Sequence, residues 1–251
     1  MQEAFFFGRP QAQVFACYHP PLGSGGEVLT VVCPPLFSEY PRTHRALRDL
    51  ALLLAAAGQH VLRFDYRGTG DSSGELEACS VTDWTRDITD TISEGRDIAD
   101  CSLVRVVAVR AGALIACEAV RSNPEVDRVV LWDPVLEGAV YLEELHKAQL
   151  TVCQRNNFLS RADRQRVMSE YGGYTLSNEM VRQLSLLGSQ TYAAVPSDKL
   201  WVVTTSSDAK VPEGCIHREQ TPFNCSWDHI STEVVVPRPV LETLRVCLTR
   251  P

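Results

Sequence analysis

The stretch Leu103–Ile115, LVRVVAVRAGALI, decides the fold of this 251-residue chain. Its first half is apolar and rich in valine, which is typical of a buried strand. The small residues Ala111, Gly112 and Ala113 follow, and further apolar residues begin a helix. A buried strand, a tight turn and an apolar helix in this order indicate a parallel sheet covered by helices. Arg110 stands at the tip of the turn.

Strand-like and helix-like segments alternate on both sides of this stretch. Strands are predicted over 5–7, 14–18, 28–33, 59–65, 103–109, 128–133 and 200–205, with a last short strand before Cys225. Helices are predicted over 44–57, over 82–95 with Thr82 as the cap, and over 239–248. The alternation stops between 138 and 195, where long amphipathic segments predict a helical insertion over the carboxyl edge of the sheet. We therefore expect an α/β core of residues 1–137 and 196–251 and a helical cap over 138–195.

Composition narrows the classes of function. The net charge of −7 argues against a nucleic-acid-binding surface. The N-terminus lacks the basic start and apolar core of a signal peptide, and no apolar run is long enough to span a membrane. Nine scattered cysteines without a CxxC pair are typical of small buried side chains in a reducing cytoplasm. We expect a cytoplasmic protein with no metal and no cofactor.

The turn Ala108–Gly112, here called the elbow, has the context of the nucleophile elbow G-x-S-x-G. That motif presents a serine at the tip between a strand and a helix. Arg110 stands at this position instead. A guanidinium stays protonated in proteins and only donates hydrogen bonds, so it cannot attack a carbonyl carbon. Any function of this chain has to accommodate that substitution.

The segment Asp65–Ser72, DYRGTGDS, carries a family resemblance. It resembles the loop after the fourth strand of α/β-hydrolases, where the loop is mostly structural, and the resemblance extends over nearly the whole chain. It implies a mainly parallel, eight-stranded-type sheet with a helical cap. We assign no catalytic role to the polar side chains of this loop.

The resemblance also implies an oxyanion-binding loop at Cys33–Phe37. In α/β-hydrolases a backbone N–H of this loop and the N–H after the nucleophile bind the oxyanion. The corresponding donors are Leu36 or Phe37, together with Ala111, because Pro34 and Pro35 have no N–H to donate. The alternative is a proline-rich strand exit without a binding role.

A histidine and an acid are expected beside the elbow. His229 lies near the C-terminus, where the family has its catalytic histidine, and it is the best candidate for a general base. Asp208 follows the strand over 200–205 at the usual position of the acid. Asp133, which follows residues 128–132 of the predicted strand, is the alternative. Either acid would orient His229, and we prefer Asp208.

Within the fold, the sequence most resembles hydrolase-like proteins of exosortase-associated exopolysaccharide clusters, which are grouped with serine aminopeptidase-like sequences. The supporting residues are the Pro-Pro start at Pro34, the Arg-x-Gly-Ala elbow at Arg110 and the stretch Leu131–Gly138, LWDPVLEG.

Arg110 at a helix N-terminus forms a potential anion site, because free N–H groups and the positive end of the helix dipole add to its charge. A buried guanidinium needs a partner, either a ligand or an internal acid such as Asp208 or Asp133.

Three hypotheses for the function follow. The first is an enzyme in which Arg110 binds an anionic ester or thioester and His229 with Asp208 activates water. The second is a catalytically dead hydrolase that binds an acyl ligand, free or carrier-bound, or a partner protein; independently of these hypotheses, a homodimer is one expected state. The third is an ordinary hydrolase with its serine elsewhere.

Overall fold

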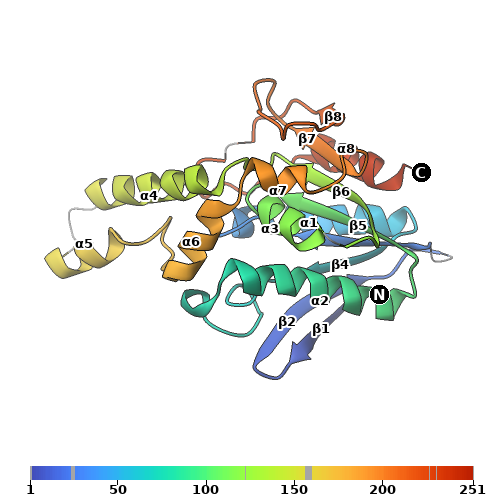
Figure 1. Ribbon diagram of the computed structural model, residues 1–251, viewed down its shortest axis with the longest axis horizontal. Helices are drawn as coiled ribbons and strands as arrows, with labels where there is room; N and C mark the ends of the chain where they lie inside the picture. Colours follow the sequence, from blue (N-terminus) through green and yellow to red (C-terminus); the bar gives the residue numbers. More distant parts are fainter. Residues whose placement is uncertain are drawn as a thin grey trace.

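The computed structural model describes residues 2–23, 26–121, 123–155, 160–225, 227–229 and 231–250. Its centre is an eight-stranded sheet in the order β1-β2-β4-β3-β5-β6-β7-β8 (Figure 1). The strands are β1 Glu3–Arg9, β2 Ala12–His19, β3 Val28–Cys33, β4 His60–Phe64, β5 Leu103–Val109, β6 Val126–Trp132, β7 Leu200–Thr204 and β8 His217–Gln220. The β1–β2 and β2–β4 pairs are antiparallel, and the remaining pairs are parallel. Strands β1 and β2 form a hairpin, and the expected mainly parallel sheet of the α/β-hydrolase fold is confirmed.

Helices cover both faces of the sheet. They are α1 Glu39–Ala56, α2 Val81–Ala99, α3 Gly112–Val120, α4 Gly138–Arg155, α5 Arg161–Val167, α6 Asn178–Leu186, α7 Ser189–Ala193 and α8 Arg238–Thr249, with a short 3₁₀ helix η1 Leu76–Ala78. Helices α1 and α8 pack together over one hydrophobic cluster, and α2 and α3 pack over the other. Both faces of the central strands are therefore buried, which accounts for their continuous apolar sequences.

Two helix starts differ from the predictions. Helix α1 begins at Glu39 rather than His44, because Pro41 fits in a first turn, where no N–H bond is required of it. Helix α2 begins at Val81, and its cap is Ser80 rather than Thr82. The Ser80 hydroxyl accepts a hydrogen bond of 3.2 Å from the amide of Asp83, whose carboxylate bonds back to the Ser80 amide. This capping box satisfies two free amides, which a cap at Thr82 would not do.

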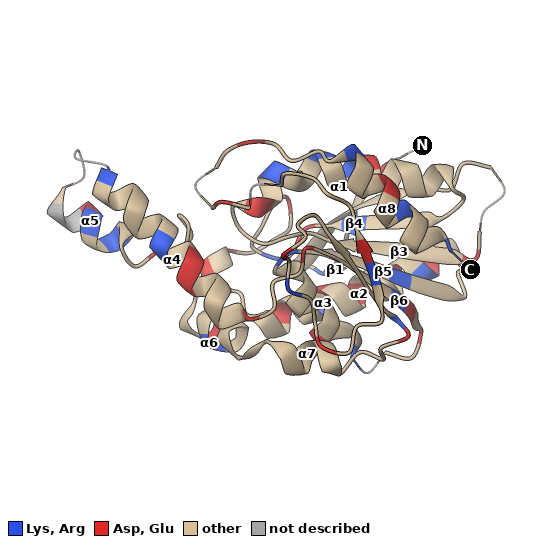
Figure 2. Ribbon diagram, turned by 90° about the horizontal axis from the view of Figure 1, so that it is seen from above, with Lys and Arg blue, Asp and Glu red and all other residues tan. Residues whose placement is uncertain are grey.

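Between β6 and β7 the described chain forms helices α4, α5, α6 and α7, joined by loops and turns, with one isolated bridge between Tyr171 and Tyr174. The division into a core and a separate helical cap over 138–195 stays a prediction. Helix α6 packs against α4 and α2, whereas α4 and α5 extend away from the sheet (Figures 1 and 2). The nine cysteines are free, and seven of them are buried. Among the described residues, no helix combines the length and the apolar character needed to cross a bilayer.

Candidate functional site at the elbow

The elbow has the strained backbone of a nucleophile turn. Arg110 lies between β5 and α3 with φ of 53°, in the left-handed region that non-glycine residues rarely adopt. Its amide donates to the carbonyl of Trp132, at 3.0 Å, which ties the tip to the end of β6. A Cβ at Gly112 would lie 2.2 Å from the carbonyl oxygen of Pro34, so the loop after β3 approaches the elbow as closely as glycine allows.

Arg110 forms a buried ion pair with Glu39, the first residue of α1. The Arg110 Nε atom lies 3.0 Å from Glu39 Oε1, and the Glu39 side chain is 0% exposed. The guanidinium also donates to the carbonyl of Asp133, at 3.1 Å, and its carbon lies 5.0 Å from the ring centroid of Trp227. The sequence predicted a partner for Arg110, either a ligand or an internal acid; the acids it named were Asp208 and Asp133, and it missed Glu39.

Tyr141 of α4 completes this cluster. Its hydroxyl lies 3.2 Å from Glu39 Oε2 and 3.4 Å from the carbonyl oxygen of Leu36. Burial opposes the charged form of Arg110, but the charge and hydrogen bond of Glu39 raise the pKa of the guanidinium above its usual range. Burial, reinforced by the Glu39 charge, raises the pKa of Tyr141 well above 10. The cluster therefore holds a charged arginine and a neutral phenol at the elbow.

The expected oxyanion loop borders the elbow. Phe37 has a left-handed backbone, with φ of 53°, and the Leu36 carbonyl accepts the first amide of α1. In the described part of the chain, no carbonyl or side chain accepts a hydrogen bond from the amides of Leu36, Phe37 and Ala111. Their convergence on one bound oxygen stays a prediction.

His229 lies close to this cluster, and no acid among the described residues is hydrogen-bonded to its ring. Its side chain is 6% exposed, and neither ring nitrogen has a hydrogen-bond partner among the described residues. Its ring centroid lies 5.3 Å from that of Tyr141, and Nε2 lies 3.9 Å from a carboxylate oxygen of Glu144. Burial first, and then the positive charge of Arg110, lower the pKa of His229 to about 4. The imidazole is therefore neutral at pH 7.

Neither predicted acid is bonded to His229. Asp133, at the end of β6, accepts hydrogen bonds from the Thr205 amide at 2.8 Å, the Thr205 hydroxyl at 2.6 Å and the Trp227 indole at 2.9 Å. Asp208 is exposed, and its carboxylate accepts a bond from Ser207. The reason lies in the strand ends: β7 stops at Thr204, and the chain then turns outward before reaching Asp208. Of the two acids, Asp133 is the one that faces the site.

A cleft of about 570 Å³ opens above the cluster. It is lined by Arg110, Asp133, Pro134, Val135, Leu136, Glu137, Val140, Tyr141, Glu144, Thr205, Ser206, Ala209, Lys210, Cys225 and Trp227. Glu39 already neutralises Arg110, so Lys210 supplies the remaining positive charge among the described residues of the lining. Three carboxylates line the same cleft. The charges of the cleft favour a neutral or cationic ligand over the anion expected from the sequence.

The chain resembles known proteins in both sequence and structure. A profile described as "Serine aminopeptidase, S33" matches residues 40–182, more than half of the chain. Est1E from Butyrivibrio proteoclasticus, solved with ferulic acid bound, is 15% identical, with a TM-score of 0.63 over 98% of this chain and 96% of that chain.

Two further solved structures are similar over almost their full length. A proline iminopeptidase-related protein from Thermus thermophilus is 15% identical, with a TM-score of 0.63 over 99% of this chain and 98% of its own. A thioesterase domain from the curacin biosynthetic pathway is 18% identical, with a TM-score of 0.57 and full coverage of both chains, 100% each. No curated protein sequence matches significantly. At such identities the similarity shows a shared fold.

Proposed function

Because this chain belongs to the serine aminopeptidase S33 family of α/β-hydrolases, we propose that it uses the hydrolase fold to bind a neutral acyl ester or thioester in the cleft above Arg110. Binding proceeds without the acyl-enzyme step of serine hydrolases. The Glu39–Arg110 ion pair at the elbow is the observation that carries this proposal. It fills the position of the attacking hydroxyl with a guanidinium that is held in place by a buried carboxylate.

The surroundings of the ion pair support binding rather than turnover. A general base is oriented and made more basic by a bonded acid, and the Asp133 carboxylate bonds to Thr205 and Trp227 instead of to His229. With a pKa of about 4, His229 is a weak base at neutral pH. The elbow thus lacks both the nucleophile and an activated histidine.

One observation favours a second candidate, in which water attacks a bound ester. The two ring nitrogens of His229 are buried without a partner in the described chain, so the neutral imidazole can accept a proton from water. This mechanism corresponds to the serine-independent hydrolase among the hypotheses from the sequence. It differs from pure binding in requiring His229 for turnover.

The ligand class rests on the lining of the cleft. Val135, Leu136 and Val140 supply apolar surface for an acyl chain, and Trp227 provides an aromatic wall. Ester and thioester groups are neutral, which suits a cleft whose arginine is already paired. The thioesterase domain among the similar structures adds support for an acyl ligand, free or attached to a carrier.

Binding of S-butyryl-N-acetylcysteamine, followed by saturation-transfer NMR, tests the proposal. Val140→Arg places a long charged side chain in the cleft and is expected to weaken binding at least tenfold. Val152→Arg is the matched control, because Val152 is an exposed valine of the same helix α4 and does not line the cleft. Equal binding by the two variants, or no saturable binding by the wild type, would contradict the proposed ligand site.

A further inference from the structure

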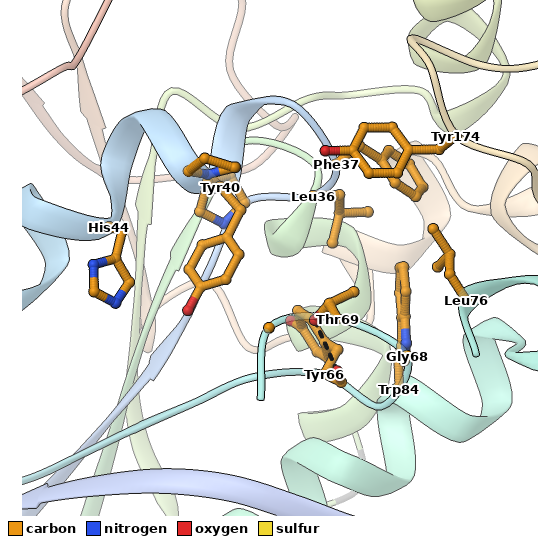
Figure 3. A pocket seen from close by; sticks show the side chains of 13 residues that line it. Leu36, Phe37, Tyr40, His44, Tyr66, Gly68, Thr69, Leu76, Trp84 and Tyr174 are labelled. Carbon is orange, nitrogen blue, oxygen red and sulfur yellow. Dashed lines mark hydrogen bonds between the residues drawn. The ribbon is translucent and has the colours of Figure 1, made fainter. Parts of the chain in front are cut away.

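We propose that a second cavity, separate from the cleft above Arg110, binds the aryl group of a small molecule. The cavity has a volume of about 330 Å³ and lies between the loop after β3, the loop after β4, helix α2 and Tyr174 (Figure 3). Phe37 lines this cavity, while Tyr141 lines the cleft, and their rings stack with centroids 6.3 Å apart. The stacked pair forms the partition between the two spaces.

Five aromatic residues line the cavity, namely Phe37, Tyr40, Tyr66, Trp84 and Tyr174. Phe37 lies 6.0 Å from Trp84 and 5.6 Å from Tyr174, with interplanar angles of 48° and 42°. Tyr66 lies 5.0 Å from Trp84 at 30°. Tilted walls of this kind present both ring faces and ring edges, and aromatic pairs in such arrangements gain energy beyond the area they bury. An aryl group can use these contacts, whereas an aliphatic chain of equal size gains only from burial.

The polar groups of the wall direct the ligand's polar end outward. The Trp84 indole donates to the carbonyl of Arg67, at 3.0 Å, and the Thr69 hydroxyl donates to the carbonyl of Tyr66, at 2.7 Å. The Tyr40 hydroxyl donates to Asp65. These three donors are engaged within the protein, and Tyr66 is the wall residue whose buried hydroxyl has no hydrogen-bond partner among the described residues. A polar group carried deep into the cavity, away from that hydroxyl, would lose its bonds to water without replacement. The ring enters first, and a polar substituent points toward exposed His44.

The wall is rigid before any ligand arrives. Phe37, a bulky residue, is held at φ of 53°, a conformation that persists only when the surroundings impose it. On the opposite wall, a Cβ at Gly68 would lie 2.7 Å from the backbone of Leu76, so the loop after β4 packs directly against η1. A preformed cavity of this kind avoids the cost of ordering on binding.

The test is ¹⁹F NMR titration of the full chain with 4-fluorobenzyl alcohol. Leu76→Trp fills the cavity and Tyr174→Leu removes one ring, and each is expected to weaken binding at least tenfold. Tyr171→Leu is the matched control, because this tyrosine belongs to the same segment but packs against His146, with centroids 5.6 Å apart. Thermal unfolding of each variant verifies that it is folded, and Tyr174→Leu keeps the test valid if Leu76→Trp does not fold.

A competition experiment tests the chemistry of the site, and binding of the probe by a variant of the cleft tests its location. Benzyl alcohol is expected to displace the probe at least fivefold better than cyclohexylmethanol, its saturated counterpart. Val140→Arg, which blocks the cleft, is expected to bind the probe like the wild type, so this inference and the proposed acyl site can fail independently. The proposal would be overturned if the wild type showed no saturable binding or if the two alcohols displaced the probe equally well. It would also be overturned if Leu76→Trp and Tyr174→Leu bound the probe fully, or if Val140→Arg lost binding.

Discussion

Replacing Arg110 with methionine is expected to lower the free energy of unfolding by about 3–5 kcal/mol, because it leaves the Glu39 carboxylate buried without its partner. Glu39 is 0% exposed, and Arg110 lies 3.0 Å from it. Among the described residues, the other hydrogen bond to the Glu39 carboxylate comes from the neutral Tyr141 hydroxyl, and the positive charge of Arg42 has a smaller effect on Glu39 than that of Arg110. Chemical denaturation in urea measures the loss.

A double-mutant cycle separates this ion pair from general damage to the core. Glu39→Leu should also cost about 3–5 kcal/mol, since it isolates the guanidinium. The double variant Glu39→Leu/Arg110→Met should cost clearly less than the sum, because no charge remains buried. Arg182→Ala, which breaks the exposed Arg182–Glu179 pair on α6, is the control and should leave the urea midpoint nearly unchanged. Additive losses at Glu39 and Arg110 would contradict the ion pair.

Asp133→Ala is the second large effect, with an expected loss of about 3–5 kcal/mol. The carboxylate accepts three hydrogen bonds, from the amide and hydroxyl of Thr205 and from the Trp227 indole. Its removal leaves these donors unsatisfied at a site where Asp133 is 7% exposed. Hydrogen bonds to charged groups contribute about 1.5–3 kcal/mol each, and they are not fully additive.

Asp208→Ala is the matched control for this prediction. Asp208 is the acid that the sequence favoured, but it is exposed and bonded locally to Ser207. Its removal should change stability by less than about 0.5 kcal/mol. Asp133→Gly removes the same carboxylate without placing a Cβ at φ of 42°, so it separates lost hydrogen bonds from backbone strain. Similar small losses for Asp133→Ala and Asp208→Ala would show that Asp133 does not anchor this region.

Much of the fold could be predicted from the sequence because its signals are local. The valine-rich run of β5 and the small residues after it define a strand and a tight turn without reference to the rest of the chain. The helix starts were less predictable. The prediction for α1 began at His44, although Pro41 fits in a first turn, and the prediction for α2 overlooked Ser80 as its cap.

The candidate site was only partly predictable, because its partners come from distant segments. The elbow at Arg110 follows from its sequence context, but Glu39 and Tyr141 join it from α1 and α4. Glu39 resembles an ordinary polar residue at a helix start. One signal could have identified it: a buried guanidinium requires an acid, and Glu39 follows directly after the loop expected to face the elbow.

The acid beside the histidine shows a different limit. Family position favoured Asp208, while the direction in which the chain leaves β7 carries that residue into solvent. Sequence position alone does not report the exit angle of a loop. The narrower resemblance to exosortase-associated proteins and the possible homodimer stay predictions.

The rate of 4-nitrophenyl butyrate hydrolysis by the wild-type protein, measured beside His229→Ala, tests the central claim most directly. The Glu39–Arg110 pair lies at the elbow, and His229 is neutral and not oriented by an acid. We therefore expect that hydrolysis above the rate in buffer, if measured, does not depend on His229. Catalytic turnover by the wild type that disappears in His229→Ala would contradict the account and establish a serine-independent hydrolase.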